Sequence, residues 1–565
     1  MKSFDHRKYP TERFGPDKRD RRWPDRALTR APTWCSVDLR DGNQALIDPM
    51  NIPKKMRFWE LLLRCGFREI EIGFPAAAQV EFDFARKLIE EERIPDDVTV
   101  QVLTQAREHL IARTYESLDG VGRAIMHVYN STSRVQREKA FRMSRDEIRQ
   151  IAVDGATWVK EYAKKYPDTE WTFQYSPESY SQTEPEFSIE VCEAVCRVWE
   201  PENGQKVILN LPATVEATTP NIFADQVEYF CDRLPSRQEV TISLHTHNDR
   251  GCAVAAAELA TMAGADRIEG TLLGNGERTG NMDIVTMAMN LYSQGVNPEL
   301  DLSRMPEIVQ CVTECNGLPV HPRHPYAGEL VFTAFSGSHQ DAIKKCLEAE
   351  DDGIWDIAYL PIDPRDVDRT YQDVVRINSQ SGKGGVAYVL QTNYGVELPR
   401  WLQIRFSQDV QKLAEDRERE LNPDEIWNLF QQVYMGHDQP YALKKFSMTK
   451  EESGDSVTAE LRTRDGSVEI SGEAFGTLGA FVDALEKRTG SKLRILNYTE
   501  HAMSAGTRAE AIAYVEMDID GHLQVGVATS QDTVGAMFKA TLAAYNQEAI
   551  RTGKDRAGRV MSEVA

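Results

Sequence analysis

Two histidines separated by one residue, His245 and His247 in Leu244-His-Thr-His-Asn-Asp249, give the strongest chemical signal in the sequence. Side chains alternate along a β-strand, so on a strand both imidazoles point to the same side. Two imidazoles held in this way can bind a divalent metal. The motif alone leaves an alternative open, in which the two rings stack on or hydrogen-bond to each other.

A carboxylate elsewhere in the chain favours the metal-binding interpretation. Asp41 follows the first predicted strand, and in a closed barrel the first strand lies near the last ones, so its carboxylate can join the two histidines. Asn281, after the last predicted strand, offers an oxygen as a fourth ligand. Mixed nitrogen and oxygen donors suit Mg, Mn, Zn or Co, whereas calcium prefers oxygen ligands alone.

The elements that must position these residues are eight β-rich runs, which alternate with amphipathic, helix-like stretches. The runs are Thr33–Leu39, Arg68–Phe74, Thr99–Thr104, Arg123–Tyr129, Glu170–Tyr175, Lys206–Leu211, Val240–His245 and Arg267–Leu273. Strand, helix and strand at this spacing predict parallel pairing through crossover connections. Eight such units match an α/β fold of the (β/α)8 TIM-barrel type better than an open doubly wound sheet, because no glycine fingerprint follows the first strand.

Polar residues lie at the C-terminal end of nearly every predicted strand. They are Asp38, Arg40, Asp41, Glu71, Gln105, His127, Ser176, Glu178, Thr214, His245, His247 and Asn275. Enzymes with a TIM barrel carry their chemistry at this end of the strands. We therefore expect a catalytic site there, since a purely structural barrel has no need of this arrangement.

The rest of the chain predicts two further domains. Residues from about 300 to 435 are mostly helical in pattern, and Asn422-Pro-Asp-Glu425 predicts a helix that Asn422 caps. From about 440, two similar strand-rich halves each lead into a Thr-x-Gly-Ala helix start, at Thr477 and Thr533, which indicates a duplicated α+β unit. We predict an N-terminal arm with a TIM-barrel catalytic domain (1–300), a connector (301–439) and a regulatory or dimer-forming α+β domain (440–565).

Composition limits the classes of partner. Lys and Arg total 66 against 88 for Asp and Glu, and the net charge of −22 argues against nucleic acid or another polyanion as partner. No run approaches the roughly 20 apolar residues of a membrane helix. The nine cysteines are scattered, and the absence of a secretory signal predicts reduced thiols in a cytoplasmic protein. Zinc binding by the pairs Cys192/Cys196 and Cys311/Cys315 is the less favoured alternative to buried thiols.

Five motifs carry a resemblance to a known family. Leu39-Arg-Asp-Gly-Asn-Gln44 with Lys55, and Leu244-His-Thr-His-Asn-Asp-Arg-Gly251, resemble the signature motifs of enzymes that condense 2-oxo acids with acyl-CoA. Three further motifs narrow the resemblance to the 2-isopropylmalate synthase family in its longer bacterial and fungal type: Gly274-Asn-Gly-Glu-Arg-Thr-Gly-Asn281, Asn378-Ser-Gln-Ser-Gly-Lys-Gly-Gly385 and Glu500-His-Ala-Met-Ser-Ala-Gly506. The resemblance runs from about residue 5 to the end of the sequence.

This resemblance implies a reaction and a set of site residues. Acetyl-CoA would condense with 3-methyl-2-oxobutanoate, and hydrolysis would release CoA and 2-isopropylmalate, the first committed product toward leucine. The residues that match the family's metal ligands are Asp41, His245, His247 and Asn281. A metal there polarises the ketone, while Arg40, which keeps its charge, stabilises the oxyanion. Substrate-pocket positions are matched by Arg40, His127, Ser176, Glu178 and Thr214.

The resemblance also implies that catalysis requires a homodimer. Removing a proton from the methyl group of a thioester requires a base, and the family's pattern points to His339 and Tyr371 in the connector, supplied by the partner subunit. Glu178, His339 and Tyr371 all stay open as the base. Backbone amides of Gly274–Gly276 and of Ser381–Gly385 either approach an anionic group of CoA or form tight turns. We further expect Mg, Mn or Zn as the divalent metal, and activation by a monovalent cation.

The C-terminal domain resembles the family's leucine-sensing domain, which implies feedback inhibition by leucine bound at a dimer interface. The matching positions are Leu478, Gly479, Tyr498, Ala502, Ala509 and Ala511. One departure from the family is the segment Gly472-Glu-Ala-Phe-Gly-Thr477, where members commonly carry a turn richer in glycine. The entry of Phe475 there bears on the shape of the leucine pocket and on the strength of feedback.

Four competing functions remain open at this point. Citramalate synthase uses pyruvate, and homocitrate synthase uses a longer diacid; one methyl group in a pocket is worth only roughly 1–3 kcal/mol of selectivity. A metal-dependent lyase or aldolase would share the Asp/His/His site but would need neither connector nor sensor domain. A non-catalytic leucine-binding protein would not need the metal ligands or Arg40.

Overall fold

The computed structural model describes residues 5–9, 14–18, 20–349, 353–370, 383–417, 419–452, 454–503 and 510–553. The chain divides into two compact units. The first comprises Met1–Val331 with Ile362–Arg369, and the second comprises Phe332–Pro361 with Thr370–Ala565. The predicted residues Tyr371 and Ala509, and the glycine-rich positions 381 and 382, lie outside the described residues.

The first unit is built on eight parallel strands that close into a barrel, in the order β1 to β8 with β8 pairing to β1. The strands are β1 Thr33–Ser36, β2 Glu69–Gly73, β3 Thr99–Gln105, β4 Arg123–Ser131, β5 Glu170–Glu178, β6 Lys206–Ala213, β7 Thr241–Thr246 and β8 Arg267–Gly270. The predicted TIM barrel is therefore confirmed, with all eight predicted strands present.

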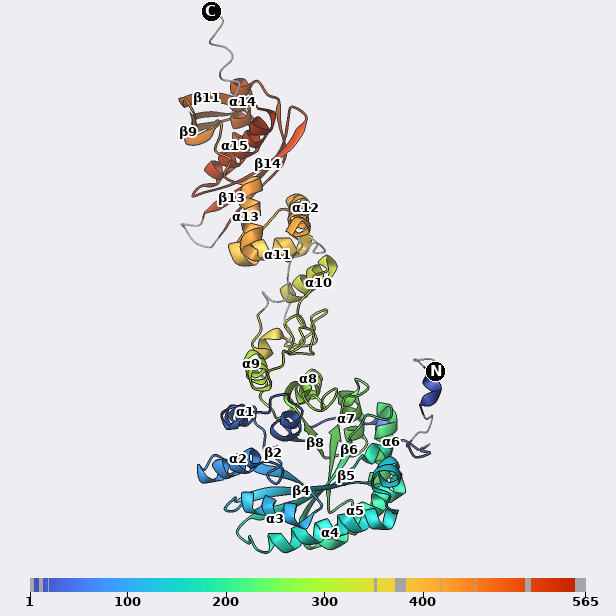
Figure 1. Cartoon of the computed structure of the whole chain (residues 1–565). Coiled ribbons are helices and arrows are strands. Elements are labelled where there is room, and N and C mark those ends of the chain that lie inside the picture. Colours follow the sequence, from blue (N-terminus) through green and yellow to red (C-terminus); the bar gives the residue numbers. More distant parts are fainter. Residues whose placement is uncertain are drawn as a thin grey trace, which may run out of the picture. The chain divides into compact units, whose positions relative to one another are not determined.

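Helices alternate with the strands and surround the barrel (Figure 1). They are α1 Ile52–Arg64, α2 Gln79–Glu90, α3 Glu108–Ser117, α4 Arg145–Ala163, α5 Pro185–Trp199, α6 Pro220–Arg233, α7 Ala253–Met262 and α8 Ile284–Tyr292, with α9 Met305–Asn316 following. Local sequence explains where they begin. Ser144 and Glu147 form a capping box at the start of α4, and Asn51 caps α1, whose first turn contains a proline.

The first strand is shorter than its sequence predicts. We expected Thr33–Leu39, but β1 ends at Ser36, and Asp38–Gly42 winds into a wide π-helical turn, η3. Within it the backbone amides of Arg40, Asp41 and Gly42 all donate to the carbonyl of Val37. Lys55 supports the turn from α1, since its buried ammonium group donates to the carbonyl of Leu39 at 2.8 Å. This turn carries Arg40 and Asp41 over the mouth of the barrel.

The second unit begins with helices α10 Gly337–Glu348, α11 Lys383–Tyr394, α12 Arg400–Arg417 and α13 Pro423–Tyr434. The predicted helix start at Asn422 is confirmed, because Asn422 and Glu425 form a capping box. Among the described residues, none of the helices combines the length and the apolar composition that crossing a membrane requires. All nine cysteines are free thiols, and both i,i+4 pairs are buried.

The C-terminal part of the second unit is a duplicated unit, as its sequence predicts. Two three-stranded antiparallel sheets each lead into one helix. The first half contains β9 Ala442–Glu451, β10 Gly454–Thr463, β11 Gly466–Ala474 and α14 Thr477–Thr489; the second contains β12 Leu493–Ala502, β13 Ala511–Ile519, β14 His522–Ser530 and α15 Thr533–Thr552. The rings of Phe481 and Phe538 stack with centroids 4.0 Å apart and join the two halves in one hydrophobic core.

Glycine allows the helix of each half to pack closely on its sheet. A Cβ added at Gly472 would lie 2.3 Å from the carbonyl oxygen of Ala480, and one at Gly526 would lie 2.0 Å from that of Ala540. Both distances are far below any van der Waals contact. Both halves thus have a glycine where the helix packs on the sheet, in keeping with their shared α+β pattern.

Candidate active site

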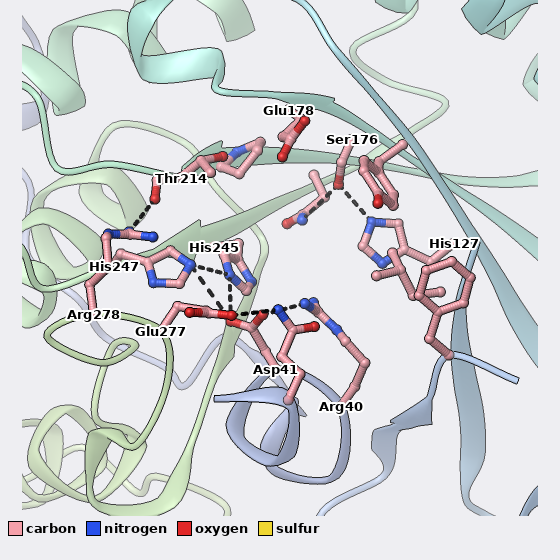
Figure 2. A pocket seen from close by; sticks show the side chains of 16 residues that line it. Arg40, Asp41, His127, Ser176, Glu178, Thr214, His245, His247, Glu277 and Arg278 are labelled. Carbon is pink, nitrogen blue, oxygen red and sulfur yellow. Dashed lines mark hydrogen bonds and ion pairs between the residues drawn. The ribbon is translucent and has the colours of Figure 1, made fainter. Parts of the chain in front are cut away.

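A pocket of about 350 Å³ lies at the C-terminal ends of the barrel strands (Figure 2). It is lined by Arg40, Asp41, Gln44, Phe74, Leu103, His127, Tyr129, Ser176, Glu178, Asn210, Pro212, Thr214, His245, His247, Glu277 and Arg278. Eight of these were predicted from sequence as metal ligands or pocket residues. The η3 segment, strands β3 to β7 and the loops after β2, β6, β7 and β8 bring the lining residues together.

Asp41, His245 and His247 converge on one point of this pocket (Figure 2). The Nε2 atoms of the two histidines are 3.1 Å apart, and Asp41 Oδ2 lies 3.4 Å from the first and 3.6 Å from the second. Within the described part of the chain, this is the one group of His, Cys, Asp and Glu side chains with the geometry to hold a metal. Two imidazole nitrogens and a carboxylate are a donor set for a divalent transition metal or magnesium.

Unsatisfied polar atoms support the fit of a cation at this point. Asp41 Oδ2 is buried without a hydrogen-bond partner, and so are both amide atoms of Asn281. The backbone of Asn281 pairs with that of His247 in an isolated β-bridge, so the two residues are neighbours. Buried polar atoms without partners are costly, and a cation at this point would satisfy the two oxygens, Oδ2 of Asp41 and Oδ1 of Asn281.

The two histidines respond to this environment in opposite ways. At His245, burial opposes the imidazolium, but the neighbouring carboxylates of Asp41 and Glu269 outweigh it and raise the pKa to about 9. At His247, burial and the charge on His245 lower the pKa to about 4. Burial also opposes the Asp41 carboxylate, yet the Arg40 charge and His245 hold its pKa below the ordinary value. Of the two imidazoles, only that of His245 is therefore favoured in its charged form.

Arg40 is fixed by two carboxylates at the edge of the pocket. Its Nη1 donates to Asp41 Oδ1 and its Nε donates to Glu71 Oε2. Burial opposes the guanidinium charge, but Asp41 and Glu71 outweigh it and raise the pKa of Arg40 above its ordinary value. The Nη2 group has no hydrogen-bond partner among the described residues. Arg40 is therefore a permanent, oriented cation with one donor group left for a ligand.

His127 and Ser176 form another part of the pocket wall. His127 Nδ1 lies 2.8 Å from Glu71 Oε1, and its Nε2 lies 2.7 Å from the hydroxyl of Ser176. Glu71 thus contacts both Arg40 and His127. The amide of Asn210 also donates to Ser176, at 3.0 Å. Sequence analysis noted Glu71 as a strand end but gave it no role, and it missed Asn210.

A buried carboxylate that sequence analysis missed lies beneath the metal-binding cluster. Glu269, on β8, is hydrogen-bonded to five side chains. Four of them come from other strands and the fifth comes from β8 itself: Gln101, Gln174, Asn210, His245 and Arg267. Its Oε2 lies 2.9 Å from Nδ1 of His245. Burial opposes its charge, but His245 and Arg267 hold the pKa of Glu269 well below the ordinary value.

A period-two pattern of polar residues was the available signal for this layer. Gln101, Gln174, Asn210 and Glu269 all occur inside β-rich runs and are fully buried. Gln101 Nε2 donates to Glu71 at 2.9 Å and to Glu269 at 3.0 Å, so it connects the Arg40 side of the pocket to the histidine side. The barrel interior below the site is thus a polar network, not a hydrophobic core.

Thr214 and Glu178 lie at the rim, and both are partly exposed. The hydroxyl of Thr214 accepts a hydrogen bond from the amide of Ser179 at 2.9 Å, which leaves its own proton to donate. Glu178 accepts a hydrogen bond from the hydroxyl of Ser131. Arg278, another residue that sequence analysis missed, pairs with Asp249 at 2.7 Å and adds a second positive charge to the rim.

The glycine turn after β8 holds Asn281 against the barrel. Gly274 has φ 75°, and a Cβ added at Gly276 would lie 2.6 Å from Oδ1 of Asn281. Glycine is therefore required for packing at this turn. Of the two interpretations that the sequence leaves open for Gly274–Gly276, this geometry favours the tight turn.

Predicted residues outside the barrel belong to the second unit. His339 lies exposed in the first turn of α10, and its ring stacks on Tyr359. At the predicted leucine site, Leu478 and Gly479 are half-buried in the first turn of α14, and Ala502 pairs with Ala511 between β12 and β13. Tyr498 lies on β12, where its hydroxyl donates to Glu500, and Phe475 is exposed before α14.

Comparisons with known proteins agree with these features. Residues 31–312 match the HMGL-like family model, 329–391 match the model for the alpha-isopropylmalate synthase post-catalytic domain, and 420–549 match the LeuA allosteric (dimerisation) domain. The 2-isopropylmalate synthase of Alcanivorax borkumensis is 53% identical over 550 residues, which cover 96% of this chain and 98% of that protein. The 2-isopropylmalate synthase of Rhodospirillum rubrum is 50% identical over 535 residues, covering 93% of this chain and 96% of that protein.

Matches to family models fall in both units, and every motif from which the family resemblance was drawn lies within the matched residues. The barrel and the pocket lie within the first matched region, and nearly all of the duplicated C-terminal domain lies within the last. The chain belongs to the 2-isopropylmalate synthase family.

Proposed function

We propose that this protein condenses acetyl-CoA with 3-methyl-2-oxobutanoate and releases CoA and 2-isopropylmalate, the first committed step toward leucine. The observation that carries the proposal is the convergence of Asp41, His245 and His247 beside Arg40 in the barrel pocket. A metal-binding cluster next to a fixed guanidinium is suited to a substrate that develops negative charge on oxygen. The ketone of a 2-oxo acid does so when a carbon nucleophile attacks it.

Asp41, His245, His247 and Asn281 would hold a divalent metal, Mg, Mn or Zn. When bound, the metal would supply Lewis-acid polarisation of the 2-oxo acid. Arg40 would donate Nη2 to the oxygen that becomes an alkoxide, because its other donors are committed to Asp41 and Glu71. The hydroxyl of Thr214 would donate to the substrate carboxylate.

The lining of the pocket supports a branched 2-oxo acid. Phe74, Leu103 and Pro212 give it an apolar wall that suits an isopropyl group. The distal carboxylate of 2-oxoglutarate would need another cation, but both lining arginines already pair with carboxylates. Pyruvate would leave part of the apolar wall without contacts, at a cost of roughly 0.8 kcal/mol for each missing carbon.

A second cavity offers a place for the arm of acetyl-CoA. This side groove, of about 380 Å³, is lined by Gln105, Ala106, Arg107, Tyr129, Asn130, Ser131, Phe141, Met143, Ile148 and Ile151. Tyr129 lines both cavities, and Ser131 in the groove bonds to Glu178 in the pocket. The largely apolar groove would hold the pantetheine chain, and the exposed Arg107 would face its phosphates.

Carbon–carbon bond formation begins when a base takes a proton from the methyl group of acetyl-CoA. The resulting enolate carbon attacks the ketone carbon, the alkoxide gains a proton, and water then cleaves the thioester to release CoA. We propose a homodimer in which His339 and Tyr371 act in the partner's site, with Glu178, His339 and Tyr371 as the candidate bases. The LeuA-type dimerisation domain supports this assembly.

Leucine would inhibit the enzyme by binding to the duplicated C-terminal domain. Leu478, Gly479, Tyr498, Ala502, Ala509 and Ala511 are the proposed contacts, from the resemblance to the family. Phe475 would border the pocket, because it precedes α14 and is exposed. We also propose that a monovalent cation activates the enzyme.

Thiol capture of released CoA tests the substrate assignment. The enzyme is assayed with acetyl-CoA, a divalent metal and one of four acids: pyruvate, 2-oxobutanoate, 3-methyl-2-oxobutanoate or 2-oxoglutarate. We expect the highest kcat/KM with 3-methyl-2-oxobutanoate, about 10–200-fold above pyruvate. A higher value for pyruvate would instead identify a citramalate synthase.

A further inference from the structure

An exposed tyrosine in the second unit is held in a strained conformation against a proposed catalytic histidine. Tyr359 has φ 67°, a left-handed value that a bulky side chain rarely adopts. The residue is 60% exposed, yet its ring stacks on the ring of His339 with centroids 4.0 Å apart and planes 25° from parallel. The two residues are 20 positions apart in the chain, so local sequence does not bring them together.

Hydrogen bonds define the turn that carries Tyr359. It lies in a tight turn that an isolated bridge closes between Ile357 and Leu360, with the amide of Leu360 donating to the carbonyl of Ile357 at 3.2 Å. The indole of Trp355 donates to the carbonyl of Leu360 at 2.9 Å. This turn presents the ring to His339 from outside α10.

Folding alone gives no reason for this arrangement. The stack is exposed, so it buries little apolar surface, and glycine would adopt the same backbone angle without strain. Backbone strain that persists in a folded protein is found most often at functional sites. His339 lies exposed in the first turn of α10, where a free imidazole would sample several rotamers. A stacked ring restricts those rotamers.

We propose that Tyr359 is a positioning residue for His339, fixing the imidazole plane in the orientation needed for proton transfer. This inference rests on the proposed function, in which His339 acts on acetyl-CoA. Proton transfer requires the base to be within hydrogen-bond reach of the methyl group, and small displacements of a catalytic group are costly. Tyr359 acts through its ring face, so its hydroxyl is dispensable.

Four full-length variants test the proposal in the presence of metal: Tyr359→Gly, Tyr359→Phe, His339→Ala and the double variant His339→Ala/Tyr359→Gly. Glycine removes the ring and also the strain, so the midpoint of thermal unfolding should stay the same or rise. We expect Tyr359→Gly to lower kcat about threefold to tenfold, which corresponds to about 0.65–1.4 kcal/mol, with both KM values within about twofold. This range matches the usual strength of an aromatic pair. Tyr359→Phe should keep at least half of kcat.

Two further readouts separate positioning from a structural role. With acetyl-CoA deuterated in the methyl group, the kinetic isotope effect should increase in Tyr359→Gly, because proton removal becomes slower. In the double variant, Tyr359→Gly should have no additional effect, because it acts only through His339. A full kcat in Tyr359→Gly, or an equal loss in the presence and absence of His339, would overturn the inference.

The outcomes also separate this inference from the proposed function. A wild-type enzyme without CoA release that depends on 3-methyl-2-oxobutanoate would overturn both. If the wild type is active and His339→Ala keeps the full rate, His339 is not needed for catalysis and the inference about Tyr359 is overturned. The metal site and the substrates of the proposed function would be unaffected by that result.

Discussion

Neutralising Glu269 should weaken metal binding although Glu269 is not one of the proposed ligands. One of its oxygens, Oε2, faces Nδ1 of His245 at 2.9 Å and the amide of Asn210 at 3.2 Å. The other, Oε1, accepts from Gln101, Gln174 and Arg267. When the His245 imidazole is neutral, as a metal ligand must be, a carboxylate at this position keeps its one proton on Nδ1, which leaves Nε2 free to bind a metal.

Glutamine at position 269 cannot satisfy both sets of donors. If its oxygen replaces Oε1, its amide group meets the N–H of His245 and drives the imidazole toward the tautomer with the proton on Nε2. Losing such an outer partner of a metal-bound histidine typically costs 10–100-fold in affinity. At 1.36 kcal/mol per tenfold, the expected weakening is about 1.4–2.7 kcal/mol.

Binding of Mn²⁺ to the metal-free protein, followed through the EPR signal of the free ion, gives the dissociation constant without an activity assay. Glu69→Gln is the matched control, because Glu69 pairs with the same Arg267 but lies at the opposite end of the strands from His245. We expect about 10–100-fold weaker binding in Glu269→Gln and less than a twofold change in Glu69→Gln. Equal affinity in wild type and Glu269→Gln would refute the role assigned to this carboxylate.

Three further predictions concern other parts of the chain. Arg40→Lys should lower kcat about 10²–10³-fold, the usual loss on removing an oxyanion donor, and an unchanged kcat in steady-state assays would contradict that role. Phe141→Ala should raise the KM for acetyl-CoA about fivefold, since roughly 1 kcal/mol of contact is lost, and should leave the KM for the 2-oxo acid unchanged. Equal changes in the two KM values would argue against the side groove as the binding site of acetyl-CoA. Gly526→Ala should destabilise the C-terminal domain by about 1–3 kcal/mol, because the new Cβ would lie 2.0 Å from the carbonyl oxygen of Ala540. As a control, Gly122→Ala should leave the unfolding midpoint unchanged, because a Cβ at Gly122 would meet open space.

The sequence was sufficient to predict the barrel and the convergence of its polar residues. Eight strands at regular spacing fixed which residues lie at the mouth, so Asp41 could be placed beside His245 and His247 although about 200 residues separate them in the chain. The duplicated C-terminal unit was visible for a similar reason, because the Thr-x-Gly-Ala helix starts recur. Regular secondary structure thus made these positions predictable.

What could not be predicted depends on local geometry. The η3 turn replaces the last part of the first predicted strand, since hydrogen bonds to Val37 outweigh the β-propensity of that segment. Glu269 and Gln101 occur in ordinary strand patterns, and their pairing across the barrel requires its three-dimensional closure. The stack of Tyr359 on His339 depends on a strained turn, for which no sequence pattern gave a signal.

The most direct test of the central claim is CoA release by the metal-depleted enzyme, before and after a divalent metal is restored, with acetyl-CoA and 3-methyl-2-oxobutanoate. Asp41→Asn is assayed in parallel, because it removes the carboxylate that joins the two histidines. We expect little CoA release without metal, full recovery in the wild type once metal is added, and no recovery in Asp41→Asn. Full activity after metal depletion, or in Asp41→Asn, would contradict the central claim.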